Sequence, residues 1–305
     1  MAEPEPEPEP EEAEEEPEGE AGEEDDSDDE EDKLEMAANA GALADMQVDF
    51  SFFDPRKSDF HGVRSLLAGG GLLPSSWDVG GLAGILVDQV EVGSVVKTAS
   101  PDSDAPADDD VLGFMTAVNL HKHSGAKCVQ QVVASVLQRT ADPKARDAVQ
   151  KLLDDASQPT ALVISERMLN MPLALVPNLV DSLLQDIDWA AANAPKEERA
   201  SFRFSRLVLL AQVAHATAGA SGDAAAAGTD TGVAGGKKRK KASMEGQAAL
   251  VDSLDFVRPE EQVLAHSADF CALLNGAGRS RQLLLSITPA AMREAVPALA
   301  ALMME

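Results

Sequence analysis

Several residue types and motifs are scarce in this 305-residue chain, and each scarcity removes a class of protein. The chain has no tyrosine, which excludes acid catalysis by a tyrosine hydroxyl. Its two cysteines, Cys128 and Cys271, are too few and too far apart for a disulfide framework or a cysteine-based zinc site. No apolar run approaches the roughly 18 residues that cross a bilayer, and the Glu-rich start resembles no secretory or organellar leader. We therefore expect a soluble protein of the cytosol or nucleus.

Catalytic motifs are missing as well. The chain holds no G-x-S-x-G elbow, no H-E-x-x-H pair and no protein-kinase signature. Ser165 stands beside Glu166, but no histidine is tied by spacing to this hydroxyl and carboxylate, as an activated nucleophile requires. We interpret Ser165–Arg167 as a structural turn in which Glu166 and Arg167 pair with neighbouring residues. The five histidines are scattered, so a cluster formed by the fold stays open.

Two stretches contain metal-binding residue types without the spacing of a metal site. His121 and His123 form an H-x-H pair with no third ligand nearby, which indicates an exposed strand-to-helix turn. Residues 100–110 are rich in aspartate and proline but lack the ordered spacing and closing glutamate of a calcium loop. We expect a surface loop there, and no bound metal or cofactor in the protein.

The negative charge of the chain is concentrated at one end. The formal net charge is −28, and residues 1–35 hold 21 of the 53 acidic residues with a single lysine, so that they carry −20. Like-charge repulsion and the scarcity of apolar residues predict that residues 1–45 form a disordered acidic tail. Such a tail keeps a protein soluble or attracts basic partners such as ribosomal proteins or histones. Ser27, which three acidic residues follow, is a candidate for phosphorylation.

A second low-complexity stretch, residues 217–247, is rich in Ala, Gly and Ser and predicts a flexible loop. It contains five adjacent cations: Lys237, Lys238, Arg239, Lys240 and Lys241. An accessible basic run of this kind is typical of a nuclear localisation signal that importin binds. RNA contact and self-association with the acidic tail are alternative roles of the cluster. We expect a nuclear protein without membrane association or direct nucleic-acid binding.

The remaining sequence, residues 46–305, predicts one folded α/β domain. The apolar run Ala161–Ile164 is typical of a buried strand, and a helix that opens at Met171–Pro172 places Leu173 on its apolar face. A buried strand that leads into an amphipathic helix needs packing layers on both sides. We expect further strands at 48–52, 93–97, 112–120, 202–213, 250–257 and 281–287, with a helix as the alternative for the second half of 202–213. A helix is expected at 60–68, with Ser58 or Asp59 as its cap. Further helices are expected at 82–90, 126–137, 143–156 and 288–304 and a turn at 258–261, and no type is assigned to 262–274.

Several stretches resemble the BCCIP family of eukaryotic nuclear proteins. The most specific is Leu162–Arg167, LVISER, which Asn170 and Pro172 follow at the family's spacing. Within it, the residues that match the family signature are Ser165, Glu166, Arg167, Asn170 and Pro172. Together with Val48–Leu67, Leu112–Leu120 and Arg281–Met292, the resemblance covers most of residues 46–305.

The resemblance implies a central mixed, twisted sheet with helices on both faces, similar to acetyltransferases of the GNAT type. Those enzymes hold the pyrophosphate of acetyl-coenzyme A on a Q/R-x-x-G-x-G/A segment, and no such segment lies between a strand and a helix here. The resemblance thus implies a non-catalytic adaptor that shuttles between nucleus and cytoplasm. It would chaperone a basic ribosomal protein in large-subunit biogenesis, act in nuclear export, and, as in animals, bind a recombination mediator and a cyclin-dependent kinase inhibitor. The alternative is an acyltransferase-like enzyme with a degenerate acetyl-coenzyme A site.

Overall fold

The computed structural model describes residues 49–71, 73–74, 76–100, 103–106, 110–215, 245–276 and 281–302. The predicted acidic tail with Ser27 lies outside these residues, as do the cations Lys237–Lys241. Of the predicted flexible loop 217–247, only the last three residues are described, and they belong to a helical segment of residues 245–252.

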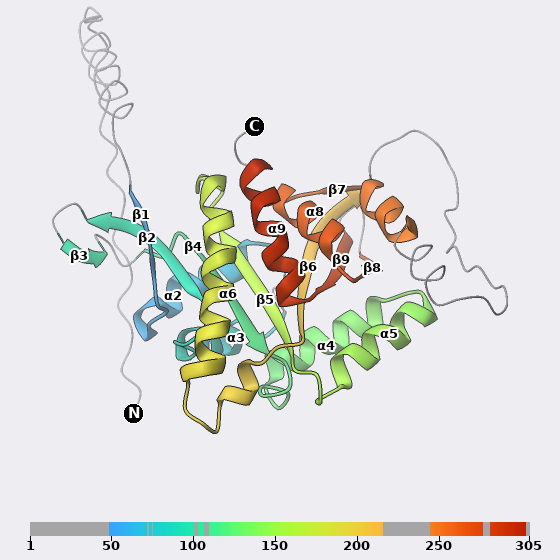
Figure 1. The fold of residues 1–305 in the computed structure, drawn as a ribbon, viewed down its shortest axis with the longest axis horizontal. Helices are drawn as coiled ribbons and strands as arrows, with labels where there is room; N and C mark the ends of the chain where they lie inside the picture. Colours follow the sequence, from blue (N-terminus) through green and yellow to red (C-terminus); the bar gives the residue numbers. More distant parts are fainter. Residues whose placement is uncertain are drawn as a thin grey trace, which may run out of the picture. The chain divides into compact units, whose positions relative to one another are not determined.

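A mixed sheet forms the centre of the described chain (Figure 1). Its main path runs β1-β2-β4-β5-β6-β9-β8, while β3 pairs with β2 and β7 pairs with β6. The pairing of β5 with β6 is parallel and the others are antiparallel. The strands are β1 (Phe50–Phe53), β2 (Ser94–Ser100), β3 (Ser103–Pro106), β4 (Gly113–Asn119), β5 (Thr160–Arg167), β6 (Arg206–His215), β7 (Leu254–Phe256), β8 (Phe270–Leu274) and β9 (Arg281–Ile287).

Helices cover both faces of this sheet, as the fold class predicted. One face carries α2 (Phe60–Gly69), α3 (Val79–Asp88), α4 (Lys127–Arg139) and α5 (Pro143–Asp154). The other carries α6 (Val176–Asn193), α8 (Pro259–Ser267) and α9 (Pro289–Leu302). Short 3-10 turns are η1 (Lys57–Asp59), η2 (Leu173–Leu175) and η3 (Arg199–Phe202). Within the described ranges, no helix is long and apolar enough to span a membrane.

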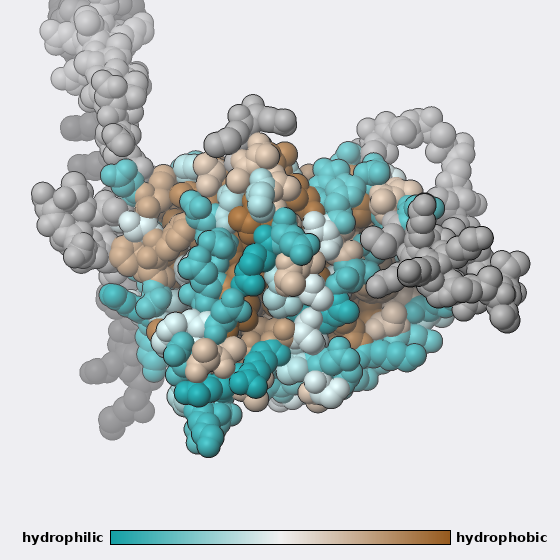
Figure 2. Space-filling model, viewed as in Figure 1, coloured by the Kyte–Doolittle hydropathy of each residue, from teal (hydrophilic) through white to brown (hydrophobic). Residues whose placement is uncertain are grey.

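The central strands β4 and β5 carry apolar residues on both faces because each strand faces two cores. In β5, Ala161 and Val163 pack against the α6–α9 side, whereas Leu162 and Ile164 pack against the α2–α5 side. Side chains alternate along a strand, so a strand between two helical layers needs apolar residues on both of its faces. All seven residues of β4 are buried for the same reason. Figure 2 shows hydrophilic side chains over α5, and apolar ones at the β1–β2 edge of the sheet.

Several predicted elements match the structure closely. The final strand β9 has the predicted bounds, and 206–213 is a strand rather than a helix. The helix at Pro143 begins with an Asp142 side chain that accepts a hydrogen bond from the Ala145 N–H. The Thr288 hydroxyl likewise accepts from the Ala291 N–H, at 3.1 Å, at the start of α9. These starts are local, so the sequence around each of them is enough to predict them.

Other predictions were wrong in identifiable ways. The predicted turn Ser165–Arg167 continues strand β5, and the predicted turn 258–261 begins helix α8. Asp59 takes the predicted position before α2 but makes no capping bond with it. Its carboxylate is buried and pairs with Lys97 at 2.6 Å. For Ser165–Arg167 and for Asp59, a partner distant in sequence decides the conformation.

Three further boundaries also need correction. Residues 103–106 form strand β3 within the predicted surface loop, because they pair with β2. The predicted strand 250–257 is a strand only over Leu254–Phe256 and is preceded by the helical segment 245–252. The helix predicted to open at Met171–Pro172 starts at Val176, and Leu173 is exposed rather than on the buried face.

Candidate functional site

The parallel strands β5 and β6 separate toward their carboxyl ends. They pair only at their starts, where Thr160–Leu162 lies beside Arg206–Val208. Farther along, Val213 of β6 pairs with β9 on one edge and with Phe256 of β7 on the other. Since β9 follows β6 along one edge, β7 takes the edge that β5 has left. The two strands therefore open like a V, at the end of a sheet where α/β proteins commonly bind ligands.

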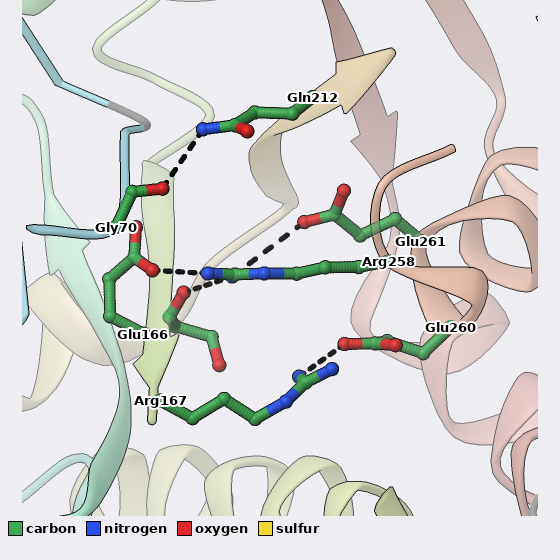
Figure 3. A network of polar contacts seen from close by, with 8 residues as sticks. Gly70, Glu166, Arg167, Gln212, Arg258, Glu260 and Glu261 are labelled. Carbon is green, nitrogen blue, oxygen red and sulfur yellow. Dashed lines mark hydrogen bonds and ion pairs between the residues drawn. The ribbon is translucent and has the colours of Figure 1, made fainter. Parts of the chain in front are cut away.

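Arg258, which follows β7 in the chain, reaches across this opening to β5 (Figure 3). Its Nη1 donates to the main-chain carbonyl of Ser165 at 2.6 Å, and its Nη2 pairs with the carboxylate of Glu166. Gln212 of β6 helps to hold the segment, because its carbonyl accepts from the Val257 N–H at 3.0 Å. The opening is thus closed by main-chain and side-chain groups of the protein itself.

Three further contacts extend the network around Arg258. Arg167 pairs with Glu260 in the first turn of α8, and Glu261 lies 3.9 Å from Arg258. Gln212 donates from Nε2 to the Gly70 carbonyl at 3.0 Å, which joins the end of α2 to β6. Together the contacts tie β5, β6, α2 and α8 to one another. We call Glu166, Arg167, Arg258, Glu260 and Glu261 the ion-pair network.

Burial controls the charges of this network. Glu166 is 1% exposed and Glu260 5%, and removal from water raises the pKa of Glu166 despite the nearby Arg258. Desolvation also raises the pKa of Glu261 to about 8, against the lowering effect of Arg258 and with a contribution from the Glu260 charge. Glu261 therefore holds its proton more tightly than an ordinary glutamate, whereas Glu166 and Glu260 pair with Arg258 and Arg167.

The network has the properties of a structural tie. One buried oxygen each of Glu166, Glu260 and Glu261 has no hydrogen-bond partner in the described part of the chain. Ser165 contributes its carbonyl oxygen and not its hydroxyl to the contacts with Arg258. Within the same ranges, no three His, Cys, Asp or Glu residues lie together to hold a metal ion. The arrangement positions a strand and a helix, and no nucleophile–base pair is assembled in it.

The predicted motif residues fall into two groups. Glu166 and Arg167 belong to the ion-pair network, and Ser165 contacts it through its carbonyl oxygen. Glu166 and Arg167 do pair with other side chains, as predicted, although the predicted turn is absent. Asn170 and Pro172 are exposed on the segment that follows β5. On that segment, residues 168–173, which we call the motif loop, Met168 is 45%, Leu169 107% and Leu173 41% exposed. Met171 alone turns inward and is buried.

Sequence reasoning missed Arg258, Glu260, Glu261 and Gln212. A local signal was available, since Pro259 at the first helical position with two glutamates in the first turn is typical of a helix start. It would have placed α8 but not its partners, because Arg258 and Glu166 lie 92 residues apart. The histidine pair His121 and His123 lies in the predicted turn between β4 and α4, but the two side chains are half-buried rather than exposed, and both ring nitrogens of His121 are buried. Cys128 is buried in the core, as predicted.

Comparison with solved structures finds a protein of similar architecture. BCP1 from *Saccharomyces cerevisiae* superposes with a TM-score of 0.56 at 16% identity, over 91% of this chain and 93% of the yeast chain. The fold is therefore that of a mixed α/β protein of the BCP1 type. The loading GNATL domain of CurA from Lyngbya majuscula aligns with a TM-score of only 0.38, too low to support an argument.

Sequence comparison identifies the family. The sequence profile described as BCCIP matches residues 45–264, and the chain belongs to the BCCIP family. The protein BCCIP homolog of Arabidopsis thaliana is 32% identical over 170 residues, which are 55% of this chain and 50% of the plant protein. The BRCA2 and CDKN1A-interacting protein of Mus musculus is 32% identical over 152 residues, or 48% of each protein. The chain thus matches about half the length of these two relatives.

Proposed function

We propose that this protein is a non-enzymatic nuclear adaptor and chaperone for basic client proteins, acting in large-subunit ribosome biogenesis and nuclear export. The observation that carries the proposal is the closed opening between β5 and β6. A ligand-binding α/β protein leaves room outside the carboxyl ends of its strands. Here Arg258 and β7 occupy that room: Arg258 bonds to Ser165 and Glu166, and β7 pairs with β6.

The motif loop supports a binding role. Leu169 is fully exposed, and Met168 and Leu173 expose nearly half of their side chains, next to a strand end that the ion-pair network fixes. Exposed apolar side chains on a rigidly held loop bind a protein partner with little loss of conformational entropy. We place the client's apolar contact on this loop. The basic groups of the client would be attracted by residues 1–35, which we call the acidic segment.

The charge distribution supports basic clients and nuclear import. Residues 1–35 carry −20, and opposite charges raise the rate at which a basic protein is captured. Lys237–Lys241 would bind importin, and phosphorylation of Ser27 would add negative charge to the acidic segment. The mouse and human relatives are named for interaction with BRCA2 and CDKN1A. Binding of a recombination mediator or a cyclin-dependent kinase inhibitor by this chain is a further part of the proposal.

The test is capture of purified large-subunit ribosomal proteins by the full-length protein and by Leu169→Asp. We expect the substitution to reduce retention of the client at least about tenfold without changing the unfolding temperature, because Leu169 makes no buried contact. Val90→Asp is the matched control, since Val90 is also an exposed apolar residue, 50% exposed, away from the motif loop. Equal capture by wild type and Leu169→Asp would contradict a client contact on this loop.

The alternative is an acyltransferase with a degenerate cofactor site. It is separated from the adaptor by thermal unfolding with acetyl-coenzyme A. A binder gains about 2.7 kcal/mol at a hundredfold excess of ligand over its dissociation constant. We expect no shift at millimolar acetyl-coenzyme A, and a saturable shift would favour the enzyme.

A further inference from the structure

A cavity of about 560 Å³ lies beside the network, on the α2–α5 face of the sheet. The last turn of α4 supplies Arg139, the start of β9 supplies Arg281 and Gln282, and the end of β8 supplies Asn275. Gln212 of β6 and Gly71, which follows α2, complete its wall. Its volume is within the range of roughly 300–1,000 Å³ that small-molecule sites occupy.

Among the residues that the structure describes, the lining of the cavity is mainly polar and includes no acidic residue. Besides the two arginines, its polar side chains are serine, glutamine and asparagine. A third cation is close, because Arg146 donates to the main-chain carbonyl of Gln138, which also lines the cavity. The cavity therefore gathers positive charge.

Arg139 is held in place by neutral groups alone. Its Nε donates to the Asn275 carbonyl at 2.6 Å, and its Nη1 donates to Oε1 of Gln282 at 2.5 Å. Its pKa is lowered, and the cause is desolvation. No carboxylate among the described residues pairs with Arg139. A guanidinium group has five N–H donors, so the two bonds fix its plane and leave donors for a ligand.

Some other arginines have carboxylate partners among the described residues, whereas Arg146 and Arg199, like Arg139, donate to main-chain carbonyls. Arg167 and Arg258 pair with the buried carboxylates of Glu260 and Glu166. Closer to the surface, Arg206 pairs with Asp269. A partly desolvated guanidinium without a carboxylate keeps an unbalanced charge, which an anion would neutralise at close range. Arg139 is thus an arginine oriented toward a cavity and lacking its counter-charge.

We propose that the cavity binds a phosphate group, with Arg139 as its principal ligand. A planar guanidinium matches phosphate oxygens in a bidentate manner. The phosphate belongs to a small phosphate ester or to a phosphorylated serine side chain, and both present the same oxygens. The site is separate from the motif loop, so its failure leaves the proposed adaptor function intact.

The test is calorimetric titration of the full-length protein with inorganic phosphate at constant ionic strength. We expect saturable phosphate binding to the wild type. Arg139→Gln should bind phosphate at least about tenfold more weakly. Ser135→Glu, which adds a carboxylate to the cavity and leaves both bonds of Arg139 in place, should abolish binding. Arg206→Gln is the matched control because its guanidinium pairs with Asp269, and it should bind phosphate as the wild type does.

Unfolding temperatures without phosphate show whether each variant is folded. If Arg139→Gln does not fold, phosphate binding by Ser135→Glu is the deciding measurement. A synthetic peptide of residues 24–32 with phosphorylated Ser27 identifies the source of the phosphate. Tighter binding of this peptide than of inorganic phosphate, with no binding of the unphosphorylated peptide, assigns the site to phosphoserine. Equal binding assigns it to small phosphates. Absence of saturable phosphate binding to the wild type, or equal binding to wild type and Ser135→Glu, would overturn the proposal.

Discussion

At the scale of single residues, Gly70 is fixed by its contact with the ion-pair network. A Cβ atom at this position would lie 2.2 Å from the Glu166 carboxylate carbon and 2.5 Å from Oε1. That carboxylate cannot move away freely, because Arg258 holds it. Only glycine leaves room for a buried carboxylate so close to the main chain.

Gly70→Ala is therefore expected to lower the free energy of unfolding by about 1–3 kcal/mol, since the carboxylate must shift within a packed site. Gly69→Ala is the matched control, because a Cβ there would meet no atom within 4 Å. Alanine is also the better helix former, so that control should keep or slightly raise stability. Urea unfolding of both variants measures the difference, and similar stability of the two would show that Glu166 is not held as described.

Glu261 makes stability depend on pH. Its pKa is about 8 in the folded protein, against 4.5 for an ordinary glutamate, so the folded state binds a proton more tightly than the unfolded state. The stability from this group is full below about pH 4.5 and is lost as the pH rises to about 8. Glu261→Gln, which imitates the protonated side chain, should flatten this fall and be more stable than wild type at pH 8.

The measurement is the unfolding free energy of both proteins from pH 5 to pH 8.5. Comparison with wild type removes the contributions of other titrating groups, among them Asp186, whose pKa burial raises to about 6. An unchanged difference between the two proteins over this range would contradict the protonated state of Glu261.

Residues buried with distant partners are the ones that sequence alone could not place. Ser165–Arg167 is polar and follows an apolar run, so the pattern predicted a turn. The strand continues because Arg258 and Glu260, both more than 90 residues away, neutralise Glu166 and Arg167 inside the protein. Asp59 failed as a predicted cap for the same reason, since its partner Lys97 is 38 residues away.

At the scale of elements, Arg258 links the β7–α8 segment to β5. Periodicity predicted β4, α4, α5 and β9, whose patterns are local and strong. It did not predict that β7 and Arg258 enter the opening between β5 and β6. That arrangement depends on pairing across the sheet, and no short stretch of sequence encodes it.

Arg258→Met should cost about 3 kcal/mol of unfolding free energy, because it leaves the carboxylate of Glu166 buried without its cation. Adding Glu166→Gln should recover much of that loss, since the buried charge is then removed as well. Arg206→Gln serves as control: its pair with Asp269 is largely solvent-exposed and should matter by less than about 1 kcal/mol. Denaturant unfolding gives all three values, and a loss for Arg258→Met no larger than the control would refute the link.

At the scale of the whole molecule, charge is divided between segments that lie outside the described residues. Replacing Lys237–Lys241 with alanine should shift a fluorescently tagged protein from the nucleus to the cytoplasm, because importin requires the basic run. Replacement of the same five residues with arginine keeps the charge and should keep the nuclear signal. Nuclear signal that persists in the alanine variant would reject this stretch as the localisation signal.

The central claim is that the folded part of the protein selects its client and that the acidic segment accelerates capture. The most direct test is affinity purification from nuclear extract with the full-length protein and with a form lacking residues 1–35, eluted along a salt gradient. The account predicts that one basic ribosomal protein is retained in stoichiometric amount by both forms, with the shortened form capturing it more slowly. If many basic proteins elute together at low salt, and none is retained without residues 1–35, the acidic segment is a generic polyanion and the claim is contradicted.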